Sequence, residues 1–197
     1  MKRNHRDHHL QEDQKEMRSA FLGGFAGQLV SGVIWLISAL IGSLGEESAA
    51  MIFLFFGCSL IFPLTQLTLR FMGRPAKVQE ENGLWALGSQ IAFTVPVNFL
   101  LVGAIIIYRA AWFYPAAMII VGAHYLPFVT LYGMRMFAVL AGSLIMGGAY
   151  LGLYGPDIFS LGGWITGMIL ILFAFLGRAQ VLKEERKASE GAVQEII

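Results

Sequence analysis

Charged residues are scarce in this sequence, and most of them lie in the tails and in short loops. Asp, Glu, Lys and Arg make up 14% of the 197 residues, whereas they make up roughly a quarter of a typical globular domain. A soluble protein with so few charges would lack the polar surface needed to cover its apolar interior. The formal net charge of +1 also argues against a nucleic-acid partner, because such proteins usually carry a basic patch.

The sequence also lacks the residue sets that most catalytic and cofactor sites require. Cys58 is its single cysteine, which excludes an internal disulfide and a cysteine metal cluster. It contains no paired carboxylates in an apolar segment, no nucleophile with a neighbouring base and no phosphate-binding loop. We therefore expect no enzyme activity, no cofactor and no metal site. The one enzymatic hypothesis left is a lipid-modifying enzyme whose loops supply Glu80, Glu81 or Asp157.

What the sequence has instead is six long apolar runs. A helix needs about 20 apolar residues to cross the hydrocarbon core, and its backbone amides must be hydrogen-bonded within the segment. The predicted spans cover residues 20–42, 49–71, 84–107, 112–131, 136–154 and 160–179. We therefore predict an all-α, polytopic integral membrane protein that forms a compact bundle of six transmembrane helices. The fourth span is the least sharply bounded, because Tyr114-Pro115 stands either at its start or within its first turn.

The lysines and arginines predict how this bundle lies in the membrane. Thirteen of the fourteen stand in the amino-terminal tail (1–19), in the second and fourth loops, and in or beside the carboxy-terminal tail (180–197), while Arg109 alone stands on the other side. Loops rich in Lys and Arg face the cytoplasm. We therefore expect both tails to be cytoplasmic and the transmembrane domain to cover residues 20–179. The first span is too long for a cleaved signal peptide and is expected to stay as an anchor.

Aromatic residues near the ends of the spans are typical of membrane–water interfaces. Tyr108, Trp112 and Tyr114 are expected to gather as anchors at the outer face. Trp35 is the exception, because it stands deep in the first span and either lines a cavity or fills the core.

Small residues recur at four-residue spacing on the first, fifth and sixth spans, which predicts close helix contacts. The sets are Gly23, Gly27 and Ser31; Ser143 and Gly147; Gly148 and Gly152; Gly163 and Gly167. They would serve packing within one chain or a homodimer. Pro63, Pro96 and Pro127 stand inside the second, third and fourth spans, where each removes a backbone hydrogen bond and favours a kink. We expect spans one, five and six to form a glycine-packed half and spans two to four an irregular half.

Polar side chains inside the spans are the candidate functional residues, since such groups are costly in a bilayer. The candidate ligand-binding residues are His124, Asn98, Gln90, Gln66 and Tyr125. In the predicted orientation Gln28, Gln66, Gln90 and His124 fall in the cytoplasmic half, so a pocket open to the cytoplasm would bring them together. The alternative is that these side chains hydrogen-bond across helices only as scaffold. No Asp or Glu stands in any span, which argues against a proton- or sodium-coupled pump.

The segment Gly122-Ala123-His124-Tyr125-Leu126-Pro127-Phe128 resembles the fourth-helix signature of a family of small, uncharacterised bacterial multi-pass membrane proteins. The Phe62-Pro63-Leu64 stretch is similar to that family's second helix. The resemblance covers most of the membrane portion and implies a protein of the bacterial inner (plasma) membrane. It implies no activity.

Two functions are consistent with these features. The first is binding or transport of a small molecule or lipid through a polar cavity formed by spans two to four, and it predicts that water reaches the polar face. The second is a non-enzymatic accessory or structural subunit that packs against another membrane protein through its glycine ridges. It predicts a dry, closed interior.

Overall fold

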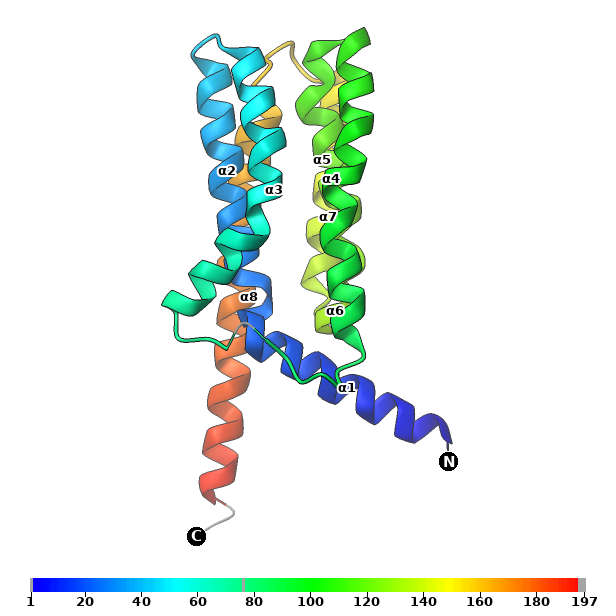
Figure 1. Ribbon diagram of the computed structural model, residues 1–197, viewed down its shortest axis with the longest axis vertical. Helices are drawn as coiled ribbons and strands as arrows, with labels where there is room; N and C mark the ends of the chain where they lie inside the picture. Colours follow the sequence, from blue (N-terminus) through cyan, green and yellow to red (C-terminus); the bar gives the residue numbers. More distant parts are fainter. Residues whose placement is uncertain (1, 76, 195–197) are drawn as a thin grey trace.

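The computed structural model describes residues 2–75 and 77–194, which form helices joined by short turns (Figure 1). Six of the helical segments in these residues are long and apolar enough to cross a membrane, and they pack into one compact bundle. The predicted fold class is therefore confirmed. The elements are α1 (Lys2–Phe21), η1 (Leu22–Gly24), α2 (Phe25–Ser43), α3 (Glu47–Phe71), α4 (Leu84–Tyr108), η2 (Ala110–Trp112), α5 (Phe113–Tyr125), α6 (Phe128–Tyr132), α7 (Met136–Tyr154) and α8 (Leu161–Gln194).

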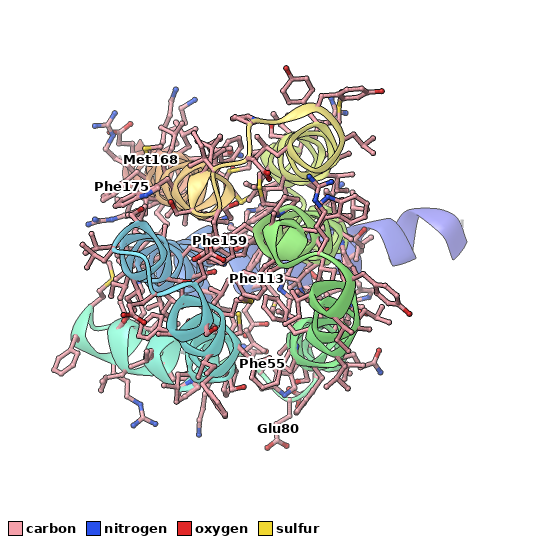
Figure 2. All side chains as sticks on the ribbon, turned by 90° about the horizontal axis from the view of Figure 1, so that it is seen from above. Phe55, Glu80, Phe113, Phe159, Met168 and Phe175 are labelled. Atoms are coloured by element: carbon pink, nitrogen blue, oxygen red, sulfur yellow. The ribbon has the colours of Figure 1, made fainter. Side chains whose placement is uncertain are left out.

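The six spanning segments divide into two groups of three. In the first lobe α2 packs along both α3 and α8, and in the second lobe α5 packs along both α4 and α7. Figure 1 shows the lobes side by side, and Figure 2 shows the same division along the bundle axis, with Phe113 and Phe159 between the lobes. Both chain termini lie at one end of the bundle, which we call the terminal end. The surface where the lobes meet is called the seam.

Small residues bring α2 and α8 close together in the first lobe. A methyl group at Gly32 would lie 3.0 Å from the carbonyl oxygen of Gly167, and a methyl group at Gly167 would lie 3.0 Å from that of Gly32. Gly23 approaches Gly177 in the same way nearer the terminal end. Backbones this close have no room for larger side chains, which is the packing that small residues permit in membranes.

The second lobe uses the same device between α5 and α7. Methyl groups at Gly122 and Gly148 would lie 3.0 Å from the Ala141 carbonyl oxygen and 2.6 Å from the Pro115 carbonyl oxygen. The expected glycine-packed half is therefore right for spans one and six, which meet through glycines, and wrong for span five. Span five packs on span four, and span two joins spans one and six. Glycine spacing predicts which face of a helix packs closely, but it does not predict which helix packs there.

The three prolines affect the helices differently. Pro63 and Pro96 stand inside α3 and α4, which continue past them, although the last part of α3 turns away from the direction of its outer part (Figure 1). At Pro127 the fourth span divides into two helices, since α5 ends at Tyr125 and α6 begins at Phe128. Pro115 is the third residue of α5, so it falls within the first turn, where a proline leaves no helical hydrogen bond unmade.

The helix α1 crosses the terminal end of the bundle instead of continuing into α2 (Figure 1). The direction changes at η1, where Leu22, Gly23 and Gly24 have φ values of 49°, 60° and 79°. Two consecutive glycines make this left-handed turn accessible, and Leu22 adopts it at a cost in strain. The carboxy-terminal half of α1 packs on the bundle through Met17, Ala20 and Phe21, which are all buried.

The helix α8 is longer than a membrane requires. Its 34 residues extend about 50 Å at 1.5 Å per residue, against about 30 Å of hydrocarbon. The charged run 183–187 lies in this extension, where Glu184 and Glu185 accept hydrogen bonds from Arg18 and Ser19 of α1.

Candidate functional site

A stripe of polar residues and one tryptophan on α2 lies buried at the seam. Gln28, Ser31, Trp35 and Ser38 follow at intervals of three and four residues, so they share one helix face, and each is buried. This face meets the second lobe at two levels. Trp35 lies 5.9 Å from the Tyr114 ring of α5, and Gly24, one turn before Gln28, approaches aromatic side chains of the second lobe.

One member of the stripe is fully hydrogen-bonded. The Ser38 hydroxyl donates to the Ala50 carbonyl oxygen at 2.8 Å, so the Tyr114 hydroxyl donates to Ser38 Oγ at 2.6 Å. Tyr114 has no exposed surface. The prediction of Tyr114 as an interfacial anchor is therefore wrong. The three residues join α2, α3 and α5, and they tie the two lobes together at the end away from the termini.

Two other members of the stripe have no such partners. Gln28 is 2% exposed and Trp35 0% exposed, yet within the described residues nothing hydrogen-bonds to Gln28 Nε2, Gln28 Oε1 or Trp35 Nε1. A buried polar group without a partner costs about 1–3 kcal/mol. Gln28 therefore presents one unused donor group and one unused acceptor to the interior of the bundle.

Gln28 lies at the depth of the predicted His124 and Tyr125. It stands ten residues from Ser38 toward the terminal end, and His124 stands ten residues from Tyr114 in the same direction. Ten helical residues span about 15 Å, so both lie in one layer. Tyr125 is buried and stacks on Phe137 with a centroid distance of 6.1 Å. A Cβ at Gly24 would lie 3.4 Å from the same Phe137 ring, so this aromatic cluster contacts the chain at Gly24, one turn before Gln28.

His124 lies on the other side of α5, against α4. Its Nδ1 is 2.9 Å from Thr94 Oγ1, and Thr94 Oγ1 in turn donates to the Ile91 carbonyl oxygen at 2.7 Å. Because the threonine proton is already used, the bond to His124 places a proton on Nδ1. The neutral ring then has Nε2 as an acceptor. His124 is half-buried and its ring lies 5.1 Å from that of Phe128.

The remaining predicted residues are not gathered around His124. Gln90 is exposed, and Gln66 and Asn98 are half-buried. Gln66 belongs to the first lobe, whereas Gln90, Asn98 and His124 belong to the second. Thr94 is the one residue of their α4 face that hydrogen-bonds to His124 within the described part of the chain. The role of these residues in ligand binding stays a prediction. Gln28 was expected in the same pocket but was not named among the candidate ligand-binding residues.

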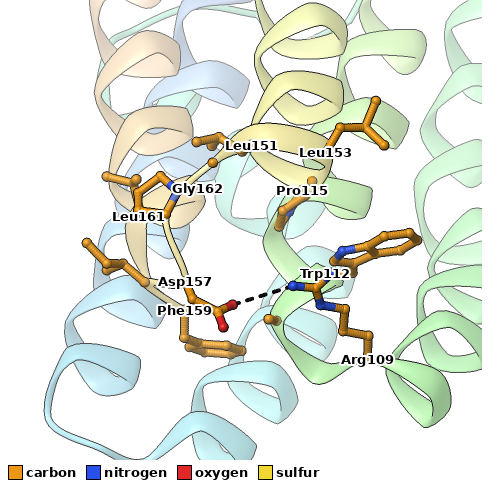
Figure 3. A pocket seen from close by; sticks show the side chains of 14 residues that line it. Arg109, Trp112, Pro115, Leu151, Leu153, Asp157, Phe159, Leu161 and Gly162 are labelled. Carbon is orange, nitrogen blue, oxygen red and sulfur yellow. Dashed lines mark ion pairs between the residues drawn. The ribbon is translucent and has the colours of Figure 1, made fainter.

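A small hollow lies at the opposite end from the termini (Figure 3). It holds about 70 Å³ beside Arg109, Trp112 and Asp157, far below the roughly 300–1,000 Å³ of small-molecule sites. The Arg109–Asp157 ion pair at 3.7 Å joins side chains that are 54% and 83% exposed, and exposed pairs contribute little. This hollow is the surface of a loop junction and is not a binding site for a solute.

The terminal end carries a polar network that holds α1 against both lobes. The Arg74 guanidinium donates two hydrogen bonds to the Glu185 carboxylate, at 2.7 and 2.9 Å, and Ser19 Oγ donates to the same carboxylate at 2.7 Å. These bonds lower the pKa of the Glu185 carboxyl, with that from Arg74 contributing most. Arg18 bridges the lobes, because it donates to the Tyr132 carbonyl oxygen at 2.6 Å and to Glu184 at 3.1 Å.

Comparison with known proteins gives one match. The model of a family described as "Family of unknown function (DUF7010)" matches residues 10–179. No curated protein matches the chain, and no solved structure matches it. The matched range begins within α1 and covers the six apolar segments.

Proposed function

The chain belongs to the family of unknown function DUF7010, and we propose that this multi-pass membrane protein binds a small molecule or lipid at the seam between its two lobes and transports it as the lobes move. The observation that carries the proposal is the buried Gln28 amide, which lacks a hydrogen-bond partner among the described residues. A ligand that offers both a donor and an acceptor, such as an amide or a protonated carboxylic acid, would satisfy both of its atoms.

The surroundings of Gln28 favour a neutral ligand with an apolar body. In the aromatic cluster one turn from it, the Phe128 and Phe137 rings lie 5.2 and 6.1 Å from the Tyr125 ring. No Asp or Glu stands in the predicted spans, so a cationic ligand would meet no carboxylate there. Aromatic walls with a few placed polar groups are typical of small-molecule sites.

The packing of the lobes supports movement at the seam. Glycines join α2 to α8 and α3 in the first lobe and α5 to α7 in the second, so these backbones are close and their relative positions are tightly set. Between the lobes, Gly162 and Gly163 of α8 lie against Tyr114 at the end away from the termini. The other contacts there include aromatic pairs, Phe55–Phe99 at 6.5 Å and Phe113–Phe159 at 6.2 Å. Side chains can change rotamer and separate, whereas a glycine crossing cannot slide without a clash.

The proposed role of His124 is to offer Nε2 as a hydrogen-bond acceptor, because its bond to Thr94 occupies Nδ1. His124 lies in the same layer as Gln28, although on the other side of α5. Movement of the second lobe would carry both His124 and Tyr125 with α5.

The proposed orientation puts the terminal end in the cytoplasm and the protein in the bacterial inner membrane, supported by the Lys and Arg residues clustered at that end.

Thiol labelling tests the proposal, and the native cysteine is removed first so that each engineered cysteine is the single reporter. Cys58 is buried at 7% exposure. In a Cys58→Ala background, single cysteines at Gln28 and His124 are treated with a membrane-impermeant thiol reagent in inverted and right-side-out vesicles. A cysteine at Glu80, in an exposed loop, is the positive control, and one at Val33, half-exposed on the outer face of α2, is the negative control.

We expect the cysteine at Gln28 to react from the terminal side, more slowly than the one at Glu80. Reaction from both sides would support transport. If the cysteine at Gln28 stays unreactive from both sides while Glu80 reacts fully, the seam does not admit water and the proposal fails. The protein would then be assigned to the accessory class.

A further inference from the structure

A long apolar groove runs between α2 and α3 on the outer surface of the first lobe. It encloses about 590 Å³ and is lined from both helices, with Val33 and Ile37 on α2 and Phe56, Leu60 and Phe71 on α3. These side chains are between 40% and 83% exposed. In a membrane they would face the hydrocarbon, so this groove is separate from the seam and does not rest on the function proposed there.

The path of α3 explains why the groove exists. At Gly57 the helices touch, because a methyl group there would lie 2.6 Å from Ile34 Cγ2. Six residues later Pro63 stands inside α3, and beyond it the helix turns aside (Figure 1). Helices that touch at one point and then diverge leave a channel along their contact, and its wall on α3 continues to Phe71.

The lining selects the kind of molecule that fits. Thr68 is its one polar residue, and the Thr68 hydroxyl donates to the Leu64 carbonyl oxygen at 2.8 Å. The lining therefore offers no free side-chain hydrogen-bond donor to a polar solute. The α3 wall from Ile52 to Phe71 extends about 28 Å at 1.5 Å per residue, which suits an extended hydrocarbon chain.

A positive charge stands where the groove ends. Arg70 is exposed and precedes Phe71, the last lining residue. No described residue forms an ion pair or hydrogen bond with its guanidinium, whereas the nearby Arg74 is engaged by Glu185. An arginine at the mouth of an apolar groove matches the phosphate of a phospholipid, because a guanidinium and a phosphate form charge-assisted hydrogen bonds.

We propose that this groove binds an anionic phospholipid, with an acyl chain between α2 and α3 and the phosphate at Arg70. The lipid would come from the leaflet at the terminal end. A second copy of the chain could also cover an apolar face of this size, and the experiment below separates the two occupants.

The test is native mass spectrometry of the full-length protein in detergent, titrated with palmitoyl-oleoyl phosphatidylglycerol or with phosphatidylcholine of the same chains. The variants are Arg70→Gln, which removes the charge, and Leu60→Trp, which fills the groove from a half-exposed position. Their matched controls are Arg135→Gln at the same end and Leu100→Trp on the exposed side of α4.

We expect the wild type to prefer phosphatidylglycerol about fivefold, as one arginine near a lipid surface contributes about 1 kcal/mol. Arg70→Gln should abolish the preference, and Leu60→Trp should weaken binding of both lipids, while both controls behave as wild type. Equal binding of the two lipids by the wild type overturns the proposal. So does an Arg135→Gln variant that loses as much as Arg70→Gln, or a dimer that Leu60→Trp dissociates without any change in bound lipid.

Discussion

Replacing Gln28 with methionine should make the protein more stable. Methionine has nearly the length and volume of glutamine and no amide, so the substitution removes two buried polar atoms that lack partners and leaves the packing filled. Substitution of a well-partnered buried amide has the opposite effect, because it also strands the partner. The sign of the change therefore reports whether the amide is free.

The expected gain follows from the burial of the site. Gln28 is 2% exposed, so water does not replace the missing hydrogen bonds, and an unsatisfied buried amide, taken as one group, costs about 1–3 kcal/mol. A gain of about 1–3 kcal/mol should raise Tm by several degrees in a chain of this size. Gln66→Met is the matched control. Its amide is only half-buried, and we expect a change within about 0.5 kcal/mol.

The native cysteine makes the assay simple. Cys58 is the single cysteine of the chain and is 7% exposed, so a thiol-reactive fluorophore reports unfolding without any engineered label. Mass spectrometry of the purified wild type identifies any copurifying small molecule. If Gln28→Met lowers Tm and nothing copurifies, the amide has a partner within the folded protein, and the argument for a ligand at the seam is refuted.

Three further predictions concern the packing and the polar contacts. Gly32→Ala should destabilise the protein by about 1–3 kcal/mol, as overpacking does, because its methyl group would lie 2.7 Å from a neighbouring side-chain atom. Gly142→Ala is the control and should not destabilise it, because the space around Gly142 is open. Thermal unfolding compares the two variants. Ser38→Ala should destabilise more than Tyr114→Phe, because it strands the buried tyrosine hydroxyl, whereas the phenylalanine variant leaves the serine bonded to its backbone acceptor; equal losses would contradict the assigned donor directions. The lowered pKa of Glu185 means that its contribution is complete above the pKa of an unfolded glutamate and declines as pH falls below that value, so the Tm difference between wild type and Glu185→Gln should shrink from pH 7 to pH 4.

The sequence predicted the number and approximate place of the spans because hydropathy is a local property. Each apolar run must be long enough to cross the bilayer, whatever it packs against. The fourth span shows the limit of this reasoning, since Pro127 was expected to kink a helix and instead separates α5 from α6. A proline lowers the stability of the helix at one point, and the tertiary packing around it decides between a bend and a break.

The partners of the helices could not be predicted in the same way. Gly148 and Gly163 are both small residues on apolar helices, but their partners differ. Gly148 packs against α5, whereas Gly163 lies against Ala39 of α2 as well as Tyr114 of α5. Tyr114 was placed at the interface because it stands near the end of a span, and its burial depends on Phe159, which arrives from a loop 45 residues later. Such contacts depend on the topology of the bundle and leave no local pattern in the sequence.

Gln28 lies between two sets of hydrogen bonds that join the lobes, and their relative strength decides which end of the seam should open. On one side is the buried Ser38–Tyr114 bond, whose separation would strand polar atoms with no water to replace them, at about 1–3 kcal/mol for each group. On the other side Arg18 bridges the lobes through the Tyr132 carbonyl oxygen and Glu184, and Glu184 is 45% exposed. Arg18 itself is 18% exposed, but water can replace it as the partner of the more exposed Glu184, so this ion pair contributes about 1 kcal/mol or less. The terminal end therefore separates at the lower cost, and a ligand that reaches Gln28 should enter from that side.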